Sequence, residues 1–405
     1  MTRKIPAQGI NLFQQIYILM REYREASSLE PLNLSLGNPD GVPCAEILEL
    51  KARFARDSGY EFHTYAEDNN IREFSEGMVA LHSGVELNQL PGTKAVPIAG
   101  IKTATAILPL ACAAFDKRSQ FTVVSNLPAY DVIGTWTEKY LGLKRLGWKL
   151  NSESNMRLDI SELKNILSQT KVDLVHVIRP GNPAAVGATL EEWLEIGKLC
   201  ADHGTRLVND AAYVGLSSDP SHVSLASVAH EVSGLEWMEL YSVSKSYNDP
   251  GARLGVAVGS KDFIDDFILI KGNTDSGPNP GVMAAYGEFF KNRKLAHQKL
   301  HELRDLYQRR LSYIVPKFIE IGLKPAHKTE AGFFTLWKVP SKAFGVKIDS
   351  AEHFNRLVIE KTGIVGVHFG ATEPLMRYAV CTDVLSPAFQ KRFEVEIQKI
   401  GPAYE

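Results

Sequence analysis

The sequence predicts an α/β protein: a mainly parallel sheet flanked by helices on both faces, followed by a smaller α+β domain. Between residues 95 and 260, short β-branched runs alternate with amphipathic stretches, which is the pattern of strands joined by crossover helices. After Pro280 this alternation gives way to one long helical run and a second group of strands. With 405 residues, of which 44% are apolar and 23% charged, the chain is long enough for more than one globular domain.

The first part of the chain contains a predicted helix, Asn11–Ala26, and a strongly apolar stretch, Ala95–Phe115. The apolar stretch has the length of a membrane span, but Lys102 and Pro109 lie within it and favour a buried strand, turn and helix. We therefore expect no membrane segment. Short β-branched runs predict buried strands at Phe121–Ser125, Asp173–Ile178, Arg206–Asn209, Glu239–Val243 and Gly255–Val258.

Helix signals separate these strands and mark the second domain. Thr189 and Glu192 have the spacing of a capping box, which opens a helix. Apolar residues recur at helical spacing over 300–314 and predict a long helix that Pro316 ends. Beyond it, a helix is predicted near Ser350–Lys361 and strands at Gly332–Trp337, Gly363–Val367 and Met376–Cys381. We expect an N-terminal segment (1–44) that belongs with the small domain, a large α/β domain (45–285) and the small domain (286–405).

Charge and cysteine content exclude several classes of protein. The formal net charge of −2 offers no basic field for a polyanion, so we expect no nucleic-acid partner. The four cysteines lie far apart without disulfide-framework spacing, and no secretory signal follows Met1–Lys4, which favours the reducing cytoplasm. His297 and His301 share a helix face but lack a third ligand, so we expect no metal site.

Polar side chains follow the predicted strands, at the edge where open α/β sheets bind ligands. Lys245 comes directly after Glu239–Val243, and Ser242 and Arg253 beside it are suited to bind a phosphate group. Asp210 directly follows Arg206–Asn209. Taken alone, Lys245 is most simply a surface lysine, and Asp210 fits a helix cap or turn residue as well as it fits a functional acid.

Three further strand ends carry weaker signals. Asn182 lies in a proline-rich turn after Asp173–Ile178, and Tyr130 follows the strand before it. Gly100 precedes Ile101 and Lys102 where a helix begins, a place where free backbone N–H groups bind anions. Together, a lysine amine, an acid and phosphate-binding groups indicate a site for pyridoxal 5′-phosphate (PLP). The lysine would form a Schiff base, and the acid would keep the pyridine nitrogen protonated so that the ring accepts electrons.

Over nearly its whole length, the chain resembles the class I/II aminotransferases, which are fold-type I PLP enzymes. The resemblance rests on the order of Asn182, Asp210-x-x-Tyr213, Ser242-x-x-Lys245 and a later arginine, Arg377. Further matches are Leu36-Gly37-Asn38-Pro39-Asp40 in the N-terminal segment, Tyr65, and Ile71-Arg72. Ile101 and Lys102 fall where diaminopimelate-type members of the family hold the cofactor phosphate.

The resemblance implies a role for each of these residues. The catalytic residues would be Lys245, which forms the Schiff base, Asp210, which binds the pyridinium nitrogen, and Tyr213, which binds the ring hydroxyl. Cofactor contacts are implied for Ile101, Lys102, Tyr130, Asn182, Asp210, Tyr213, Ser242, Lys245, Arg253 and, across the interface of a homodimer, Tyr65. Substrate contacts are implied for Gly37, Asn182 and Arg377, the last as a clamp on the α-carboxylate.

Departures from the family pattern leave the substrate open. The usual Asn-Pro-Thr-Gly is replaced by Asn182-Pro183-Ala184-Ala185-Val186-Gly187, and the usual Asp-Glu-x-Tyr by Asp210-Ala211-Ala212-Tyr213. The stretch from Tyr65 to Ile71 is shorter than usual and carries Asn69-Asn70. The leading interpretation is a PLP-dependent aminotransferase acting between an L-amino acid and a 2-oxo acid. A lyase, decarboxylase or cyclising synthase of the same fold is the alternative, and a non-catalytic PLP-fold protein is a third.

Overall fold

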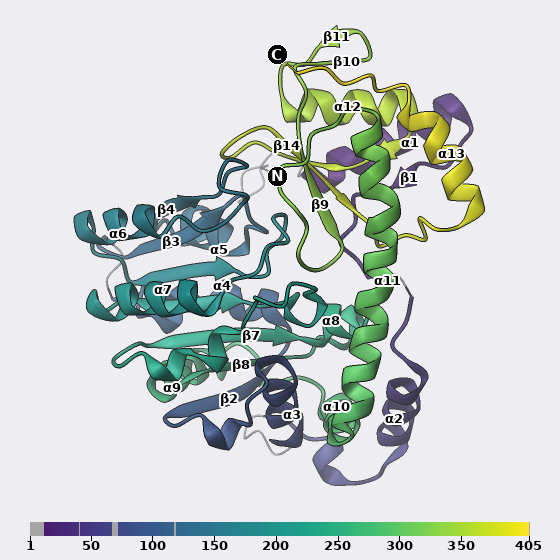
Figure 1. The fold of residues 1–405 in the computed structure, drawn as a ribbon. Coiled ribbons are helices and arrows are strands. Elements are labelled where there is room, and N and C mark those ends of the chain that lie inside the picture. The colour runs from purple at the N-terminus through teal and green to yellow at the C-terminus, as the bar shows by residue number, and fades with distance from the viewer. Residues whose placement is uncertain (1–11, 40, 67–71, 117–118, 405) are drawn as a thin grey trace, which may run out of the picture. The chain divides into compact units, whose positions relative to one another are not determined.

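The computed structural model describes residues 12–39, 41–66, 72–116 and 119–404 (Figure 1). Seven strands form its largest sheet: β2 (Thr93–Ile98), β3 (Thr122–Leu127), β4 (Lys144–Lys149), β5 (Leu174–Ile178), β6 (Arg206–Asp210), β7 (Trp237–Ser242) and β8 (Gly255–Ser260). Their order is β2-β8-β7-β6-β5-β3-β4. The pairs from β7 to β4 are all parallel, whereas β8 runs antiparallel to both of its neighbours. The prediction of a mainly parallel sheet is confirmed.

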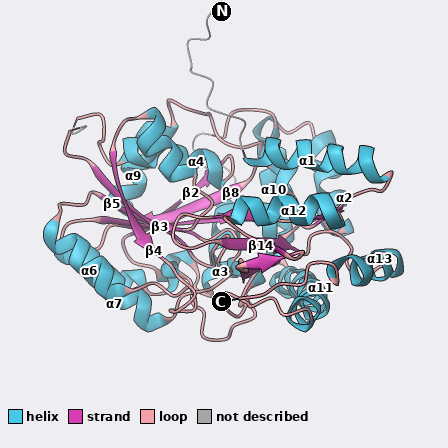
Figure 2. Cartoon of the chain, turned by 90° about the horizontal axis from the view of Figure 1, so that it is seen from above, coloured by secondary structure: helices cyan, strands magenta, loops and turns pink. Residues whose placement is uncertain are grey.

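Helices cover both faces of this sheet, as Figure 2 shows. The α-helices of the larger unit, besides the first part of α11, are α2 (Ala45–Arg56), α3 (Arg72–Ser83), α4 (Ile101–Ala111), α5 (Val132–Gly134), α6 (Ile160–Gln169), α7 (Leu190–Asp202), α8 (Val243–Ser246), α9 (Lys261–Lys271) and α10 (Pro280–Lys291). Helices α4 and α9 pack together on one face, and α6 and α7 on the other. Under α4 and α9, Leu108, Phe263 and Phe267 belong to one core cluster with Val208 and Leu240 of the sheet.

Local sequence signals account for several of these elements. The Thr189 hydroxyl accepts a hydrogen bond from Glu192 N, and the Glu192 carboxylate accepts one from Thr189 N, so the predicted capping box opens α7. The stretch Ala95–Phe115 forms most of β2, a turn at Gly100 and α4, as predicted. In the described ranges, none of the helices is both long and apolar enough to cross a membrane.

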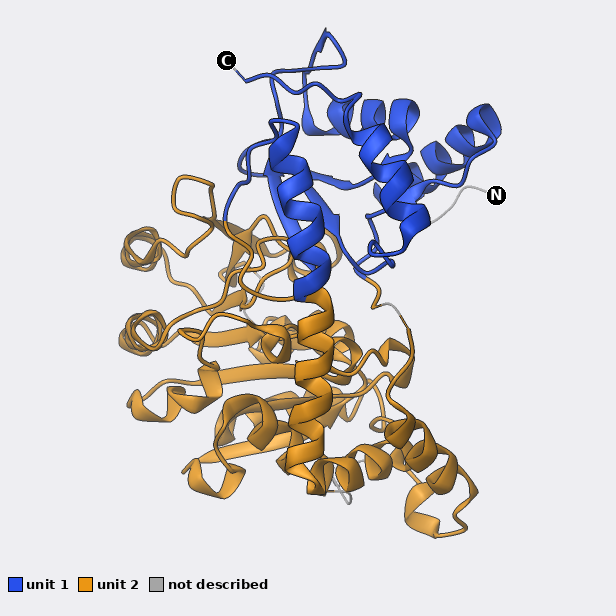
Figure 3. Ribbon diagram, turned by 45° about the vertical axis from the view of Figure 1, so that its right-hand side comes forward, with its two compact units in different colours: residues 1–37, 308–327, 333–405 blue, residues 38–307, 328–332 orange. Residues whose placement is uncertain are grey.

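Contacts group the chain into two compact units (Figure 3). The larger comprises 38–307 and 328–332, and the smaller takes its described residues from 1–37, 308–327 and 333–405. The division between 307 and 308 falls inside the long helix α11 (Arg293–Glu320). The domain boundaries expected after 44 and 285 stay predictions.

The smaller unit is an α+β structure. Its antiparallel sheet has the order β13-β14-β9, and β1 pairs with β12 in parallel. Its strands are β1 (Leu32–Asn33), β9 (Phe334–Lys338), β10 (Lys342–Ala343), β11 (Val346–Lys347), β12 (Ile364–Val365), β13 (Val367–Phe369) and β14 (Leu375–Ala379). Its helices, besides the last part of α11, are α1 (Leu12–Ser27), α12 (Ala351–Thr362) and α13 (Pro387–Ile397).

Helix α11 continues through Pro316, so the prediction that Pro316 ends it was wrong. A proline in a helix interior costs about 3 kcal/mol because it removes a hydrogen bond and crowds the preceding turn. The turn beyond it carries Phe318, which is fully buried. The Phe318 ring lies with its centroid 5.0 Å from that of Trp337 and 4.6 Å from that of Tyr378. Packing within the smaller unit therefore outweighs the local penalty.

Candidate active site

The carboxyl ends of β3, β5, β6 and β7 share one edge of the sheet because these strands are parallel. In the strand register, Asp210 at the end of β6 lies opposite Ile178 of β5 and Leu240 of β7. The antiparallel strands reach the same edge, since Gly255 pairs with both Ser242 and Ile98. In the larger unit, the sheet brings to this edge the predicted site residues Ile101, Lys102, Tyr130, Asn182, Asp210, Tyr213, Ser242, Lys245 and Arg253.

Asp210 and Lys245 form the electrostatic centre of this edge. Lys245 is half-buried in α8, the single helical turn that follows β7. Asp210 is 8% exposed and accepts a hydrogen bond from Ala212 N at 3.1 Å. Burial raises the pKa of Asp210 to about 7, although this hydrogen bond and the nearby Lys245 charge favour ionisation. A cation placed against the carboxylate would offset the cost of burying its charge, as a protonated pyridine nitrogen does.

A second feature, the cradle formed by Gly100, Arg253 and the start of α4, suits an anion. Gly100 precedes α4 with φ +88°, and a Cβ built on it would lie 2.4 Å from Nη2 of Arg253. The positive φ favours glycine, and a side chain here would displace the Arg253 guanidinium from the start of α4. The first turn of α4, with Ile101 and Lys102, directs backbone N–H groups toward its N-terminal end. The guanidinium and these N–H groups offer the donors that a phosphate group needs.

Ser242 contacts the sequence neighbours of Arg253, which belongs to the cradle, and of Lys245. It is 4% exposed, and its hydroxyl accepts a hydrogen bond from Ser244 N at 3.1 Å, which caps α8. The Ser242 hydroxyl also lies 2.9 Å from Oγ of Ser244 and 3.4 Å from the carbonyl oxygen of Leu254, next to Arg253. The capped turn fixes the direction in which Lys245 leaves the backbone.

Buried asparagines hold the strand ends together. Asn209 accepts a hydrogen bond from Arg179 N at 2.8 Å and donates one to its carbonyl oxygen at 2.9 Å, which joins β6 to the residue after β5. Asn126 accepts a hydrogen bond from Ile178 N at 3.0 Å, which joins β3 to β5. We did not predict these two positioning residues. A side-chain amide within or directly beside a predicted buried strand was the signal that could have identified them, because buried polar groups need hydrogen-bond partners.

The remaining predicted residues of the larger unit differ in exposure. Asn182 is buried, and its backbone carbonyl oxygen accepts a hydrogen bond from Tyr130 N at 2.8 Å. The Tyr130 ring is 41% exposed, and the ammonium of Lys102 lies 5.7 Å from its centroid. Tyr213 is 5% exposed, whereas Tyr65 is 76% exposed.

Two predicted substrate residues belong to the smaller unit. Arg377 on β14 is 3% exposed, donates a hydrogen bond to the carbonyl oxygen of Ser35, and has its guanidinium carbon 4.3 Å from the Phe334 ring centroid. Gly37 packs against the same ring, since a Cβ built on it would lie 2.7 Å from Cζ of Phe334. Asp40 and Asn69–Ile71 of the predicted motifs lie outside the described residues.

A lysine beside a buried acid, with an anion cradle, at the carboxyl edge of a mainly parallel sheet defines the PLP-binding class of α/β enzymes. The raised pKa of Asp210 and the approach of Arg253 to Gly100 both fit a ligand that carries a cationic ring nitrogen and a phosphate group.

Comparison with known proteins gives the family. The model of aminotransferase class I and II matches residues 30–384, so the chain belongs to this family. The LL-diaminopimelate aminotransferase of Methanocaldococcus jannaschii is 27% identical over 360 residues, covering 87% of this chain and 81% of that protein. The aspartate aminotransferase of Bacillus subtilis is 29% identical over 248 residues, covering 60% of this chain and 62% of that protein. The substrate-bound BacF structure from Bacillus subtilis shares the fold, with a TM-score of 0.82, 19% identity, and coverage of 100% and 99%.

The chain is therefore a PLP-dependent aminotransferase, with amino acids and 2-oxo acids as its class of substrates. The family and the relatives named as aminotransferases favour transamination over the lyase, decarboxylase and synthase alternatives. They also favour an enzyme over a non-catalytic protein of the same fold.

Proposed function

We propose that Lys245 is the catalytic amine of this aminotransferase, and that an L-amino acid substrate is bound through its α-carboxylate by Arg377. The observation that carries the proposal is the placement of Asp210 near Lys245: a buried carboxyl group whose pKa lies at about 7. A cationic ligand that makes this carboxylate ionise gains a buried, charge-assisted hydrogen bond.

Each residue has one task in the proposed mechanism. When bound, PLP supplies an electron sink for the bond that breaks at the α-carbon of the substrate. The Lys245 amine takes the proton from that carbon and returns it as a general base and acid. Asp210 keeps the ring nitrogen protonated, and Asn182 and Tyr213 hold the ring hydroxyl.

The rest of the site binds and orients. Arg253, Ser242 and the start of α4 would hold the phosphate group, and the exposed Tyr130 ring would offer an aromatic contact to the pyridine. Arg377 offers a planar pair of N–H donors, which matches the two oxygens of an α-carboxylate.

The proposed reaction is tested with a panel of amino donors. Both named relatives take their names from amino acids with two carboxylates, so the panel begins with diaminopimelate and aspartate and continues with basic and aromatic amino acids. We expect at least one donor to convert bound PLP to pyridoxamine phosphate, seen as loss of the visible absorbance. Release of ammonia or CO2 without that conversion would overturn the proposal in favour of a lyase or decarboxylase.

We further propose a homodimer in which Tyr65 completes the cofactor site of the other subunit. Exposed apolar side chains gather in the same part of the chain: Val42 is 70% exposed, Tyr60 79% and Tyr65 76%. Such residues mark association surfaces when they lie together. We also propose a cytoplasmic location, which is supported by the four free cysteines Cys44, Cys112, Cys200 and Cys381.

Hybrid dimers test the shared site. Lys245→Ala and Tyr65→Ala chains are each expected to be inactive, and mixing them should restore activity because one site of the hybrid carries neither lesion. Mixing Lys245→Ala with Asp210→Asn is the control, since each site of that hybrid keeps one lesion. Full activity of a monomer at high dilution would contradict the proposal.

A further inference from the structure

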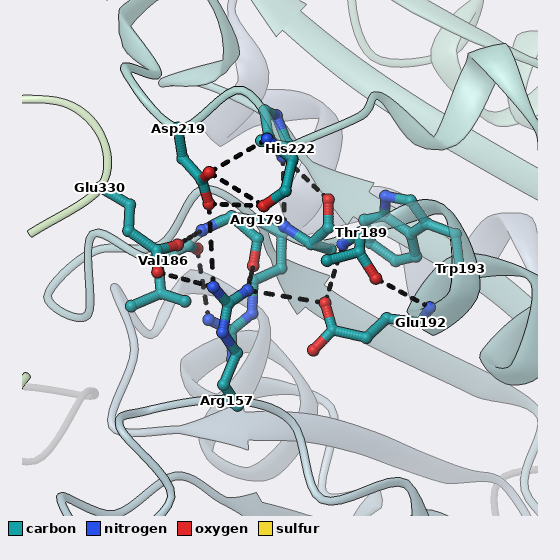
Figure 4. Close-up of polar contacts among 12 residues, drawn as sticks. Arg157, Arg179, Val186, Thr189, Glu192, Trp193, Asp219, His222 and Glu330 are labelled. Carbon is teal, nitrogen blue, oxygen red and sulfur yellow. Dashed lines mark hydrogen bonds and ion pairs between the residues drawn. The ribbon is translucent and has the colours of Figure 1, made fainter. Parts of the chain in front are cut away.

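A cluster of charged side chains holds the loop that follows β5 (Figure 4). We call residues 182–188 the Asn182 loop, after the residue proposed to bind the cofactor ring. Arg157 and Glu330 contact the same residue of this loop from two sides. Gly187 N donates a hydrogen bond to Oε2 of Glu330 at 3.1 Å, and its carbonyl oxygen accepts one from Nη1 of Arg157 at 3.3 Å. The two side chains are joined by an ion pair, with Nη2 of Arg157 2.6 Å from Oε1 of Glu330.

Further contacts fix the rest of the loop. The backbone N–H groups of Glu330 and Ala331 donate to the carbonyl oxygen of Ala185 at 2.9 and 3.1 Å. Arg179 is fully buried and donates to the carbonyl oxygen of Val186 at 3.2 Å. Gly187 has no room for a side chain, because a Cβ built on it would lie 2.7 Å from Nδ1 of His222.

The loop needs this support because Ala185 is strained. Its φ is +53°, in the left-handed region that disfavours every residue with a Cβ. In the usual Asn-Pro-Thr-Gly pattern a glycine stands at this position. This chain therefore keeps a left-handed turn without the residue that normally adopts it, and tertiary contacts must supply the difference.

The ion pair between Arg157 and Glu330 is partly buried and belongs to a larger group of charges. The Arg157 side chain is 31% exposed and the Glu330 side chain 16% exposed, and Glu192 and Asp219 add carboxylates 3.7 and 3.8 Å from Arg157. Glu330 belongs to residues 328–332, which group with the larger unit although the chain on either side of them groups with the smaller one. The contacts of Glu330 and Ala331 with the Asn182 loop account for this grouping.

We propose that Arg157 and Glu330 are positioning residues for the cofactor: their ion pair holds the Asn182 loop in its strained turn, so that the Asn182 amide faces the hydroxyl of the PLP ring. Neither residue touches the reacting atoms. The inference rests on the proposed function, because the contact of Asn182 with the cofactor is part of that proposal.

Glu330→Gln tests the inference, since it removes the charge and keeps the size. In the cofactor-free protein, we expect amide exchange in the Asn182 loop to become about tenfold faster. In the loaded enzyme, the Kd for PLP should rise and kcat should fall by about tenfold, with a smaller change in KM. A hydrogen bond from Asn182 favours the anionic form of the ring oxygen, so loosening it should also raise the pH midpoint of the visible absorbance.

Two further variants separate positioning from general stability. Glu236→Gln makes the same chemical change in the ion pair with Arg206, at the amino ends of the strands. It should leave loop exchange, the Kd for PLP, kcat and the pH midpoint of the absorbance unchanged. Ala185→Gly should restore the loop in the Glu330→Gln background, because glycine adopts the left-handed turn without support. Rescue by Ala185→Gly is the result that a merely structural ion pair would not produce.

The possible failures are distinguishable. If Glu330→Gln lowers thermal stability but leaves loop exchange, PLP affinity and the absorbance midpoint unchanged, the pair is only structural and the inference is overturned. If Asn182→Ala leaves the midpoint of the otherwise unaltered enzyme unchanged, the proposed role of Asn182 fails instead. Should Glu330→Gln not fold, Arg157→Lys, which keeps the charge but loses the paired donors, should shift the same measurements in the same directions. Unchanged values in that variant would also overturn the inference.

Discussion

Strand β6 carries a charged side chain at each end, and the two ends differ in how the charge is satisfied. At the amino end, Arg206 donates hydrogen bonds to the carboxylates of Glu236 and Asp266 and, at 2.8 Å, to the carbonyl oxygen of Ala111. At the carboxyl end, the Asp210 side chain accepts one hydrogen bond from the described part of the chain, from Ala212 N. The arginine is fully paired by the protein itself, whereas the acid retains acceptor capacity.

The pKa values record this difference. Burial lowers the pKa of Arg206, but its hydrogen bonds to Glu236 and Asp266 outweigh burial and leave the pKa above its ordinary value. Burial raises the pKa of Asp210 to about 7, and the opposing contacts do not compensate. The protein itself supplies the partners of Arg206, as expected for a structural charge. Asp210 keeps acceptor capacity for a ligand, as expected for a charge in a functional site.

Among substitutions at the carboxyl edge of the sheet, Lys245→Ala should cause the largest loss of activity. The variant should lose all measurable turnover, since no other amine takes the place of Lys245 in the proposed mechanism. Borohydride reduction of the PLP-loaded enzyme, followed by peptide mapping, should label Lys245. Lys261→Ala, which removes an exposed lysine paired with Asp265, is the matched control and should keep full activity. Labelling of a different lysine would show that the site is wrongly assigned.

Asp210→Asn should keep PLP bound but lower kcat by about 10²–10³-fold, a few kcal/mol of transition-state stabilisation. An amide does not hold the ring nitrogen protonated, so the ring accepts electrons less well. Steady-state kinetics and the PLP content of the purified variant provide the measurement. Turnover near that of the unaltered enzyme would mean that ring protonation is supplied by another group or is unnecessary.

The buried carboxyl group of Asp210 should make the stability of the cofactor-free protein depend on pH. The folded pKa of about 7 exceeds the ordinary value of 3.8, so the folded protein binds an extra proton between about pH 4 and 7. The free energy of unfolding should therefore fall as pH rises through this window, by up to about 4 kcal/mol. Denaturant titrations should show this slope in the cofactor-free protein and not in Asp210→Asn. An equal slope in both would assign it to other groups.

Signals that lie close together in the sequence predicted their elements well. The spacing of Thr189 and Glu192 was enough to place the start of α7, and the β-branched runs identified β5 and β6. Strand ends could also be recognised as the place for Lys245 and Asp210. The extent of α11 was not predictable in this way, because the packing of Phe318 decides it.

Contacts between distant residues account for what the sequence did not reveal. Arg157 and Glu330 are 173 residues apart, and nothing near either residue indicates that they share Gly187. The amide of Asn209 finds the backbone of Arg179 only when β5 and β6 are paired. Positive φ at Ala185 is likewise set by tertiary contacts, against the preference of the residue itself.

Arg377→Lys tests the proposed role of Arg377, on β14, as the clamp on the substrate α-carboxylate. Lysine keeps the charge but offers no planar fork, so kcat/KM for an α-amino acid should fall by about 10- to 100-fold, as expected for a lost charge-assisted hydrogen bond. The same change should matter far less for an amine without an α-carboxylate, and the PLP content should stay normal. Equal losses for both substrates would mean that Arg377 supports the fold instead.

The smallest change in stability and activity is expected at the amino end of β6. The sign of the stability change there should be opposite to the sign at the carboxyl end. Glu236→Gln removes one of the two carboxylates paired with Arg206, and Glu236 is 41% exposed, so water replaces much of the lost interaction. We expect the free energy of unfolding to fall by about 0.5–1 kcal/mol and kcat/KM to stay within about twofold of its original value. Asp210→Asn should do the reverse in the cofactor-free protein at pH 8: it removes an under-partnered buried charge, so the free energy of unfolding should rise. Denaturant titration of both variants under the same conditions measures the two changes in the free energy of unfolding. If both substitutions lower stability, the chain satisfies Asp210 as fully as it does Arg206, and the difference between the two ends of the strand does not exist.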